Sequence, residues 1–93
     1  MILWDENKNI LNIKNHGFSF NLAQMVFDDP YHLTIQDRVE NYEVRYQTIG
    51  LIENIVLILV AHTCEDEEGR EKIRLISARK ATKKERSLYE KSN

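Results

Sequence analysis

Apolar and polar residues in the second half of the chain follow the patterns of β-strands. Two segments alternate apolar with polar side chains, which is the period of a half-buried strand. A third segment is an unbroken apolar run and predicts a central strand covered on both faces. A fourth mixes branched apolar residues with arginines. These predicted strands cover residues 31–37, 44–52, 55–61 and 72–79.

Alternation also predicts which side chains share a face. In the first of these strands, Tyr31, Leu33 and Ile35 are predicted to face the core. In the second, one side carries Tyr46, Thr48 and Gly50. Polar segments between the strands predict a loop, a tight turn and a longer acidic connection at residues 38–41, 53–54 and 64–69.

Two helices are predicted ahead of the sheet. Asp5 can cap a helix over residues 6–15, and Gly17 suits the left-handed position that ends many helices. Ser19 can cap a second helix that ends near residue 28, because Pro30 disfavours helical geometry at the residue before it. The predicted buried side of the first helix is formed by Ile10, Leu11 and Ile13.

The C-terminal segment predicts a strand that runs into a basic helix. Thr82 and Glu85 match the capping-box pattern, in which two side chains satisfy each other's backbone N–H groups at a helix start. The helix is expected over residues 83–91. Arg79 and Lys80 are therefore predicted to lie at a strand-to-helix corner.

These elements predict one α+β domain over residues 1–93. A short apolar segment at residues 2–4 adds a possible edge strand to the four strands above. Runs of helices beside an antiparallel sheet define the α+β class. We expect an antiparallel sheet of four to five strands, with two N-terminal helices and one C-terminal helix.

Composition narrows the setting of the protein. Cys64 is the only cysteine, which excludes an intrachain disulfide and favours the reducing cytoplasm. The longest apolar run is too short to span a bilayer, so no membrane association is predicted. The net charge of −2 hides an asymmetry, since residues 70–93 hold nine Lys and Arg against three acids. This basic end favours an anionic partner.

Several segments of the chain resemble the BrnT family of type II toxins. The most specific is the run from Ile73 to Thr82, followed by Glu85 and Tyr89. The chain departs from the family at Asn15, where a lysine is usual, and in its acidic connection over residues 64–69. Further segments that carry the resemblance are Trp4-Asp5, His16-Gly17, Phe20, Phe27-Asp28-Asp29-Pro30, Arg45, Ile49-Gly50 and His62-Thr63.

The resemblance implies a RelE-like ribonuclease that arrests translation by cutting RNA. It also implies a cognate antitoxin that holds the toxin inactive and carries a ribbon-helix-helix DNA-binding segment. DNA contact would then occur only through the antitoxin. A non-catalytic binding protein that assembles with an acidic or DNA-binding partner is the alternative.

Cleavage of RNA without a metal requires a 2′-hydroxyl to be deprotonated, the crowded phosphate to be stabilised and the leaving 5′-oxygen to be protonated. Arg74 and Arg79 are predicted to bind the phosphate, because a guanidinium keeps its charge and offers paired donors. Arg45 is a third candidate for this role. His62 or Glu43 is predicted to transfer protons.

Each of these candidates also has a structural interpretation. Arg74 can pair with Glu43 or another strand carboxylate, and Arg45 can lie on a solvated strand face. His62 can be a strand-end imidazole that is hydrogen-bonded to a loop. His62 and Cys64 with one acidic residue lack the spacing of a zinc site, so no metal or cofactor is predicted.

The basic end supplies the predicted RNA-binding residues. Lys83, Lys84 and Arg86 either bind the RNA backbone or form a solvated helix face. Lys80 adds a positive charge at the corner. Tyr89 either packs in the core or stacks on an RNA base.

Overall fold

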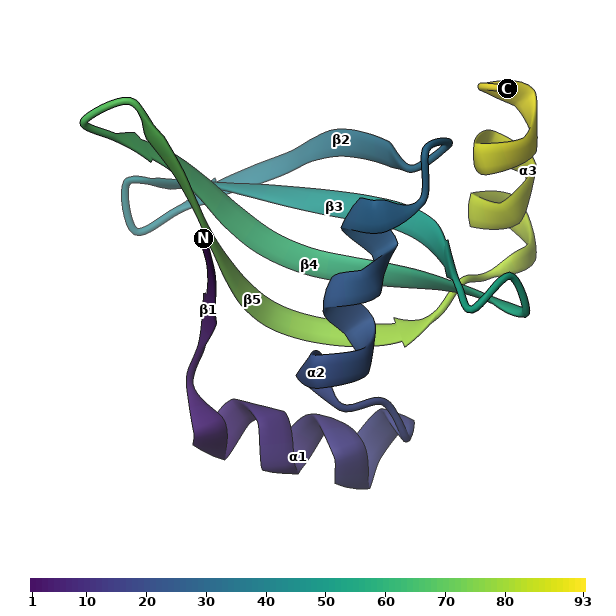
Figure 1. The fold of residues 1–93 in the computed structure, drawn as a ribbon, viewed down its shortest axis with the longest axis horizontal. Coiled ribbons are helices and arrows are strands. Elements are labelled where there is room, and N and C mark those ends of the chain that lie inside the picture. Colours follow the sequence, from purple (N-terminus) through teal and green to yellow (C-terminus); the bar gives the residue numbers. More distant parts are fainter.

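A computed structural model describes the chain over residues 1–93, and it shows a five-stranded sheet with helices on both faces (Figure 1). The strands lie in the order β1-β5-β4-β3-β2, with β1 parallel to β5 and every other pair antiparallel. The predicted α+β class is confirmed. The elements are β1 (Ile2–Trp4), α1 (Glu6–His16), α2 (Phe20–Ala23), the 3₁₀ helix η1 (Gln24–Asp28), β2 (Leu33–Glu40), β3 (Glu43–Ile52), β4 (Val56–Glu67), β5 (Arg70–Lys80) and α3 (Lys83–Lys91).

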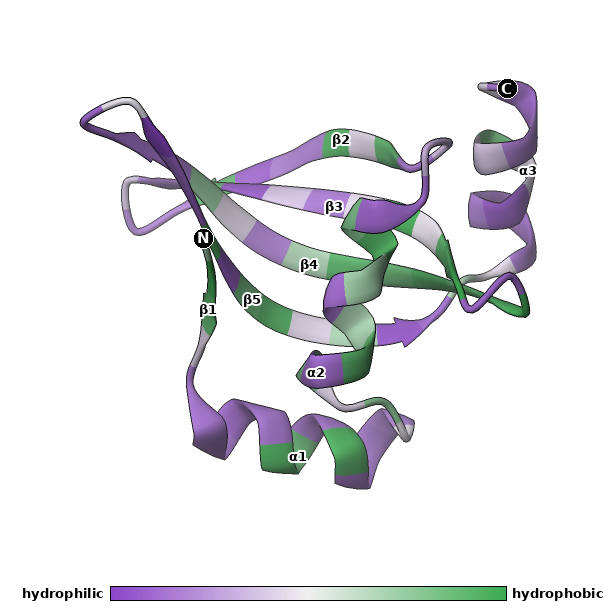
Figure 2. Ribbon diagram, in the orientation of Figure 1, coloured by the Kyte–Doolittle hydropathy of each residue, from purple (hydrophilic) through white to green (hydrophobic).

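The two faces of the sheet carry separate apolar clusters. One face, called here the η1 face, packs Val60 and Ile58 against α2 and η1. The other, called the α3 face, packs Ile49 and Leu59 against Tyr89 of α3. Because β4 is apolar on both faces near its start, it is the central strand, as its unbroken apolar run predicted (Figure 2).

The predicted helix starts are confirmed. The side chains of Asp5, Ser19 and Thr82 each accept a hydrogen bond from a backbone N–H of the first turn. Gly17 ends α1 with a φ of 80°, in the left-handed region that glycine adopts without strain. The second helix is split, since α2 ends at Ala23 and the chain continues as η1.

The prediction for the buried side of α1 is wrong. Ile10, Leu11 and Ile13 are 57%, 56% and 46% exposed, whereas Asn9 and Asn12 are buried. The Asn12 amide donates to the carbonyl oxygen of Ala78 and accepts from its N–H, at 2.8 and 3.0 Å. The helix therefore docks on the edge of β5 through hydrogen bonds to backbone, which an apolar pattern does not reveal.

Three further predictions about the strands are wrong. Tyr31 precedes β2 and is 61% exposed, so it does not face the core. Residues 38–40 belong to β2, and the turn is confined to Asn41 and Tyr42, both at positive φ. The acidic residues 65–67 pair with β5, so the connection after β4 is only Glu68 and Gly69.

Gly50 explains how closely η1 approaches β3. A Cβ atom on Gly50 would lie 3.0 Å from both the Cβ and the carbonyl oxygen of Val26. Any larger side chain would push η1 away from the sheet. No helix of the protein is long and apolar enough to span a bilayer.

Candidate active site on the α3 face

Arg45 and Arg74 lie on the same face of the sheet, on either side of one residue of β4. Arg45 pairs with Thr63 from β3, and Arg74 pairs with Thr63 from β5. Paired residues point to the same face, and strands lie about 4.8 Å apart, so the two Cα atoms are roughly 10 Å apart. Thr63, between them, is only 2% exposed.

A β-bulge brings Arg79 to this face as well. Arg74 and Arg79 are five positions apart, and in a regular strand they would point to opposite faces. Arg74 pairs with Thr63 and Arg79 with Leu59, which are four positions apart on β4. The extra residue of β5, Ile76, restores the parity, as bulges do when they redirect side chains.

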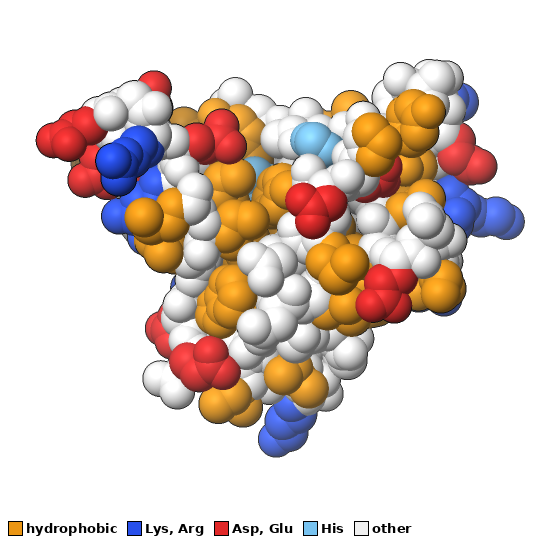
Figure 3. Space-filling model, viewed as in Figure 1, with side chains coloured by type: hydrophobic (Ala, Val, Ile, Leu, Met, Phe, Trp, Pro, Cys, Tyr) orange, Lys and Arg blue, Asp and Glu red, His pale blue; other side chains and the backbone are white.

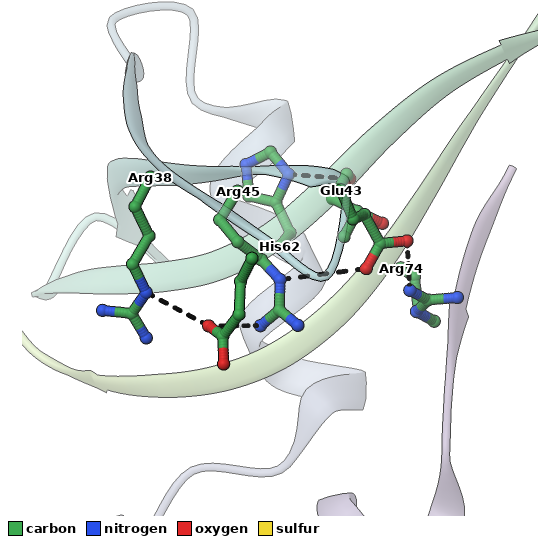
Figure 4. Close-up of polar contacts among 7 residues, drawn as sticks. Arg38, Glu43, Arg45, His62 and Arg74 are labelled. Carbon is green, nitrogen blue, oxygen red and sulfur yellow. Dashed lines mark hydrogen bonds and ion pairs between the residues drawn. The ribbon is translucent and has the colours of Figure 1, made fainter.

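Glu43 lies between Arg45 and Arg74 (Figure 4). Its Oε2 accepts a hydrogen bond from Nη2 of Arg74 at 2.6 Å. Its Oε1 lies 3.8 Å from Nε of Arg45, which is too long for a hydrogen bond. The carboxylate of Glu43 therefore occupies the position between the two guanidinium groups.

Arg45 has a buried donor without a partner. Its Nε is buried and has no hydrogen-bond partner. Its Nη1 lies 3.9 Å from Glu40 Oε2, and that carboxylate is bound more closely by Arg38, at 3.1 Å. The side chain of Arg45 is 20% exposed. Such a partly buried guanidinium gains more from a phosphate than a fully solvated one.

Arg79 is held by a bidentate pair. Its Nη1 and Nη2 donate to Oε1 and Oε2 of Glu85, both at 2.8 Å. Glu85 also completes the capping box, because its Oε1 accepts from the backbone N–H of Thr82. The hydrogen bond from Arg79 lowers the pKa of Glu85 to about 2, and the same bond raises the pKa of Arg79.

An uncharged strip separates the Arg45 and Arg74 pair from Arg79. In the row between them, Gln47 and Ser77 pair with Ala61 from either side. The charged rows are four positions apart along β4, or roughly 13 Å at 3.3 Å per residue. Sequence reasoning did not single out Ser77 or Glu40, because only the strand register places them beside the arginines.

His62 is not brought together with the arginines. It lies on the η1 face, pairs with Tyr46 and is 2% exposed. Its Nδ1 donates to the carbonyl oxygen of Thr63 at 3.0 Å, so in the neutral ring Nε2 accepts from the hydroxyl of Thr48 at 2.7 Å. Burial lowers the pKa of His62. These contacts give His62 a structural place in the core.

The structure separates the remaining predicted residues into two groups. Tyr89 is 7% exposed and donates from its hydroxyl to Asp29 at 2.6 Å, so its ring is packed in the core and not open to a base. Burial and this hydrogen bond raise the pKa of Tyr89 to about 12. The exposed cations of the basic end are Lys80, Lys83, Lys84 and Arg86.

The donor set on this face suits an anion. No group of three His, Cys, Asp or Glu side chains in the chain is placed to hold a metal ion. Guanidinium groups on one face of the sheet of a small α+β domain are donors whose geometry matches carboxylate and phosphate groups. A nucleic-acid backbone is an anion of this kind.

The chain belongs to the family described as ribonuclease toxin, BrnT, of type II toxin-antitoxin system, which matches residues 4–85. It is also similar to the 1.1 Å crystal structure of the Brucella abortus ribonuclease toxin BrnT, with a TM-score of 0.67 and 25% sequence identity. That likeness covers 88% of this chain and 96% of the Brucella abortus chain. A comparison with curated proteins finds no match. Membership of the family implies an RNA target and an antitoxin partner.

Proposed function

We propose that this toxin is an endoribonuclease that cuts RNA without a metal ion, with the scissile phosphate bound between Arg45 and Arg74. The observation that carries the proposal is the pair of guanidinium groups on either side of Glu43, of which Arg45 has no hydrogen-bond partner for its Nε. A phosphate bound there is stabilised as its charge grows in the transition state. Arginine keeps its proton throughout.

Glu43 is proposed as the general base. When a phosphate displaces its carboxylate from Arg74, the carboxylate stays beside the bound ribose and takes the proton of the 2′-hydroxyl. The 2′-oxygen then forms a bond to phosphorus, and the bond from phosphorus to the 5′-oxygen breaks. The 5′-oxygen takes a proton from water. The products are a 2′,3′-cyclic phosphate and a 5′-hydroxyl end.

Arg79 and the basic end are proposed to hold the RNA strand. Arg79 borders the far side of the uncharged strip, so it can contact a phosphate beside the scissile one. Lys80, Lys83, Lys84 and Arg86 are exposed and add contacts that do not depend on base sequence. His62 is proposed to support the sheet from the η1 face, and it has no direct contact with RNA.

The nuclease proposal is tested with purified toxin and a labelled single-stranded RNA in EDTA. We expect cleavage with 2′,3′-cyclic phosphate ends, and a loss of about 100-fold or more in the cleavage rate for Arg45→Ala and for Arg74→Ala. Arg70→Ala is the matched control, because this substitution removes the same charge from an exposed arginine beside the β4–β5 turn. No cleavage by the wild type in EDTA, or equal losses in all three variants, would contradict the proposal.

The partner is proposed to be an antitoxin with a ribbon-helix-helix segment that neutralises the toxin in the cytoplasm and provides the only DNA contact. Expression of the toxin alone in a bacterium is expected to stop growth, and co-expression of the antitoxin should restore it. The carboxylates that already pair with Arg74 and Arg79 favour a second candidate, a non-catalytic binding protein. That protein would leave growth unaffected and RNA intact.

A further inference from the structure

A cavity of about 290 Å³ opens on the η1 face, away from the arginines. It lies between the end of η1 and the strands β2 to β5. Figure 3 shows histidine side chains on this face beside hydrophobic ones, with acidic side chains nearby. We call it the acid-rimmed cavity; its lining residues are Phe27, His32, Thr34, Tyr46, His62, Cys64, Glu71 and Ile73.

Aromatic rings form the walls of this cavity. Tyr46 stacks on His62 with ring centres 6.0 Å apart and an interplanar angle of 21°. Phe27 meets His62 edge to face, with centres 5.2 Å apart. Both ring nitrogens of His62 are used in hydrogen bonds and the residue is 2% exposed, so a ligand would meet the rings of Tyr46 and Phe27. Ring faces attract cations and flat groups.

The rim of the cavity carries negative charge from Glu71 and the neighbouring Asp66. Glu71 lies directly opposite Asp66 on the neighbouring strand, and like charges in that arrangement repel. The other acids of the β4–β5 hairpin do not line the cavity. Among them, Glu67 pairs with Lys72 at 3.6 Å. The Met1 ammonium donates to the backbone carbonyl oxygen of Glu71 at 2.9 Å, and the Glu71 carboxylate lies beside the Cys64 thiol.

The Cys64 thiol lies close enough to Glu71 and Asp66 to feel their charges. Burial raises the pKa of Cys64, and the negative charges of Glu71 and Asp66 raise it further. The two carboxylates therefore act on the thiol that lines the cavity. No lysine or arginine lines the cavity itself, whereas Met1, Arg70 and Lys72 lie with Glu71 around a separate hollow outside it.

These features fit a guanidinium group. An aromatic wall with a carboxylate at its rim binds a flat cation through its face and its edge at once, which an ammonium does less well. The volume lies at the lower end of ligand cavities, which span about 300–1,000 Å³, so a side chain fits better than a nucleotide. The phosphate of a nucleotide would also meet Glu71 and Asp66.

We propose that the acid-rimmed cavity binds an arginine side chain of the antitoxin. This inference rests on the proposed antitoxin partner and is independent of the nuclease chemistry. It anchors the antitoxin on the η1 face, so the anchor does not compete with RNA for the α3 face. Arginine is also among the side chains that contribute most to protein interfaces.

The first experiment titrates N-acetyl-L-arginine amide into ¹⁵N-labelled toxin and follows backbone amide shifts. We expect saturable shifts at Tyr46, Cys64 and Glu71, and weaker shifts with N-acetyl-L-lysine amide. Glu71→Gln should weaken binding roughly fivefold, as expected for one partly exposed charge pair. Glu67→Gln is the matched control, because Glu67 lies in the same hairpin and pairs with Lys72.

The second experiment measures the dissociation constant of the full-length antitoxin for each variant. Glu71→Gln is expected to weaken the complex at least as much as it weakens the probe, and Glu67→Gln should leave it unchanged. Equal affinity of Glu71→Gln and wild type for the antitoxin would overturn the proposal. So would stronger shifts with adenosine monophosphate than with the arginine probe, which would show a nucleotide site. Neither result depends on whether the toxin cuts RNA.

Discussion

Single asparagine side chains attach α1 to the rest of the protein. β1 covers the edge of β5 only from Ile73 to Leu75. Further along that edge, the Asn12 amide makes both hydrogen bonds to Ala78 that a neighbouring strand would make. Asn9 accepts from the N–H of Phe20 at 2.8 Å and fixes the start of α2. Polar side chains thus attach this helix, where apolar side chains usually do so.

Asn12→Ala is expected to lower the free energy of unfolding by about 2–4 kcal/mol, because it leaves two buried backbone groups of Ala78 without partners. The better helix propensity of alanine offsets only about 0.5 kcal/mol of this loss. Urea unfolding checks the value. Asn15→Ala removes an exposed amide from the same helix and should stay within about 0.5 kcal/mol of wild type. Similar losses in both variants would show that Asn12 has no special role.

The sequence therefore predicted where α1 lies along the chain but not which side is buried. The ends of the helix follow from local signals, since Asp5 and Gly17 act on the residues next to them. The buried side depends on what the helix meets, which is the backbone edge of β5. Ile10 and Ile13 mark an apolar side, but no neighbouring element covers it.

The C-terminal helix and the arginine next to it form one unit. Glu85 binds the first turn of α3 with one oxygen and Arg79 with both. Tyr89 then ties α3 to Asp29 at the end of η1. Burial raises the pKa of Asp29, but hydrogen bonds from the Leu51 N–H, the Tyr89 hydroxyl and the Tyr31 N–H outweigh it and lower that pKa.

This unit predicts a stability difference that depends on pH. The pKa of Glu85 is about 2 in the folded protein and 4.5 ordinarily, so its stabilising effect is full above pH 4.5 and is lost as the pH falls to about 2. Above pH 4.5, Glu85→Gln should therefore be less stable than wild type by about 1–2 kcal/mol. This difference in stability is smaller than the full pKa shift of Glu85 implies, because Arg79 is 36% exposed and solvent screens the ion pair.

Urea unfolding at a series of pH values from 2 to 7 measures this difference. The two proteins should converge near pH 2. Glu90→Gln is the control, since Glu90 is exposed on the same helix and forms no ion pair. A gap between wild type and Glu85→Gln that stays constant with pH would show that the pair with Arg79 contributes nothing through its charge.

The arginine site was only partly predictable because it depends on strand register. Arg45, Arg74, Arg79 and Glu43 were singled out by residue type and by the family resemblance. Their common face requires the bulge at Ile76, which has no marker in the sequence. His62 lies on the other face because it precedes Thr63, which pairs with Arg45 and Arg74, and successive residues of a strand point to opposite faces.

At the scale of the whole molecule, the two faces of the sheet carry different charges. Its net charge is −2, yet the exposed cations of α3 lie beside the arginine face. The acids Asp66 and Glu71 belong to the η1 face. α1 lies far from α3, at the other side of the sheet (Figure 1). RNA and an antitoxin arginine would therefore meet opposite charges on opposite faces.

This separation predicts how salt affects RNA binding. A 2′-O-methyl RNA, which has no nucleophile and is not cut, should bind with a logarithm of affinity that falls linearly with the logarithm of the salt concentration. Each cation that touches a phosphate contributes a slope of about −0.7 for a single strand. Lys84→Ala should weaken binding for all RNA sequences alike and make the slope shallower by about 0.7, whereas the cleavage rate of bound RNA stays unchanged.

Lys8→Ala removes the same charge from α1 and should change neither the affinity nor the slope, because RNA on the α3 face does not reach α1. If Lys8→Ala lowers the slope as much as Lys84→Ala does, the net charge of the molecule governs binding and the basic end is not the RNA surface.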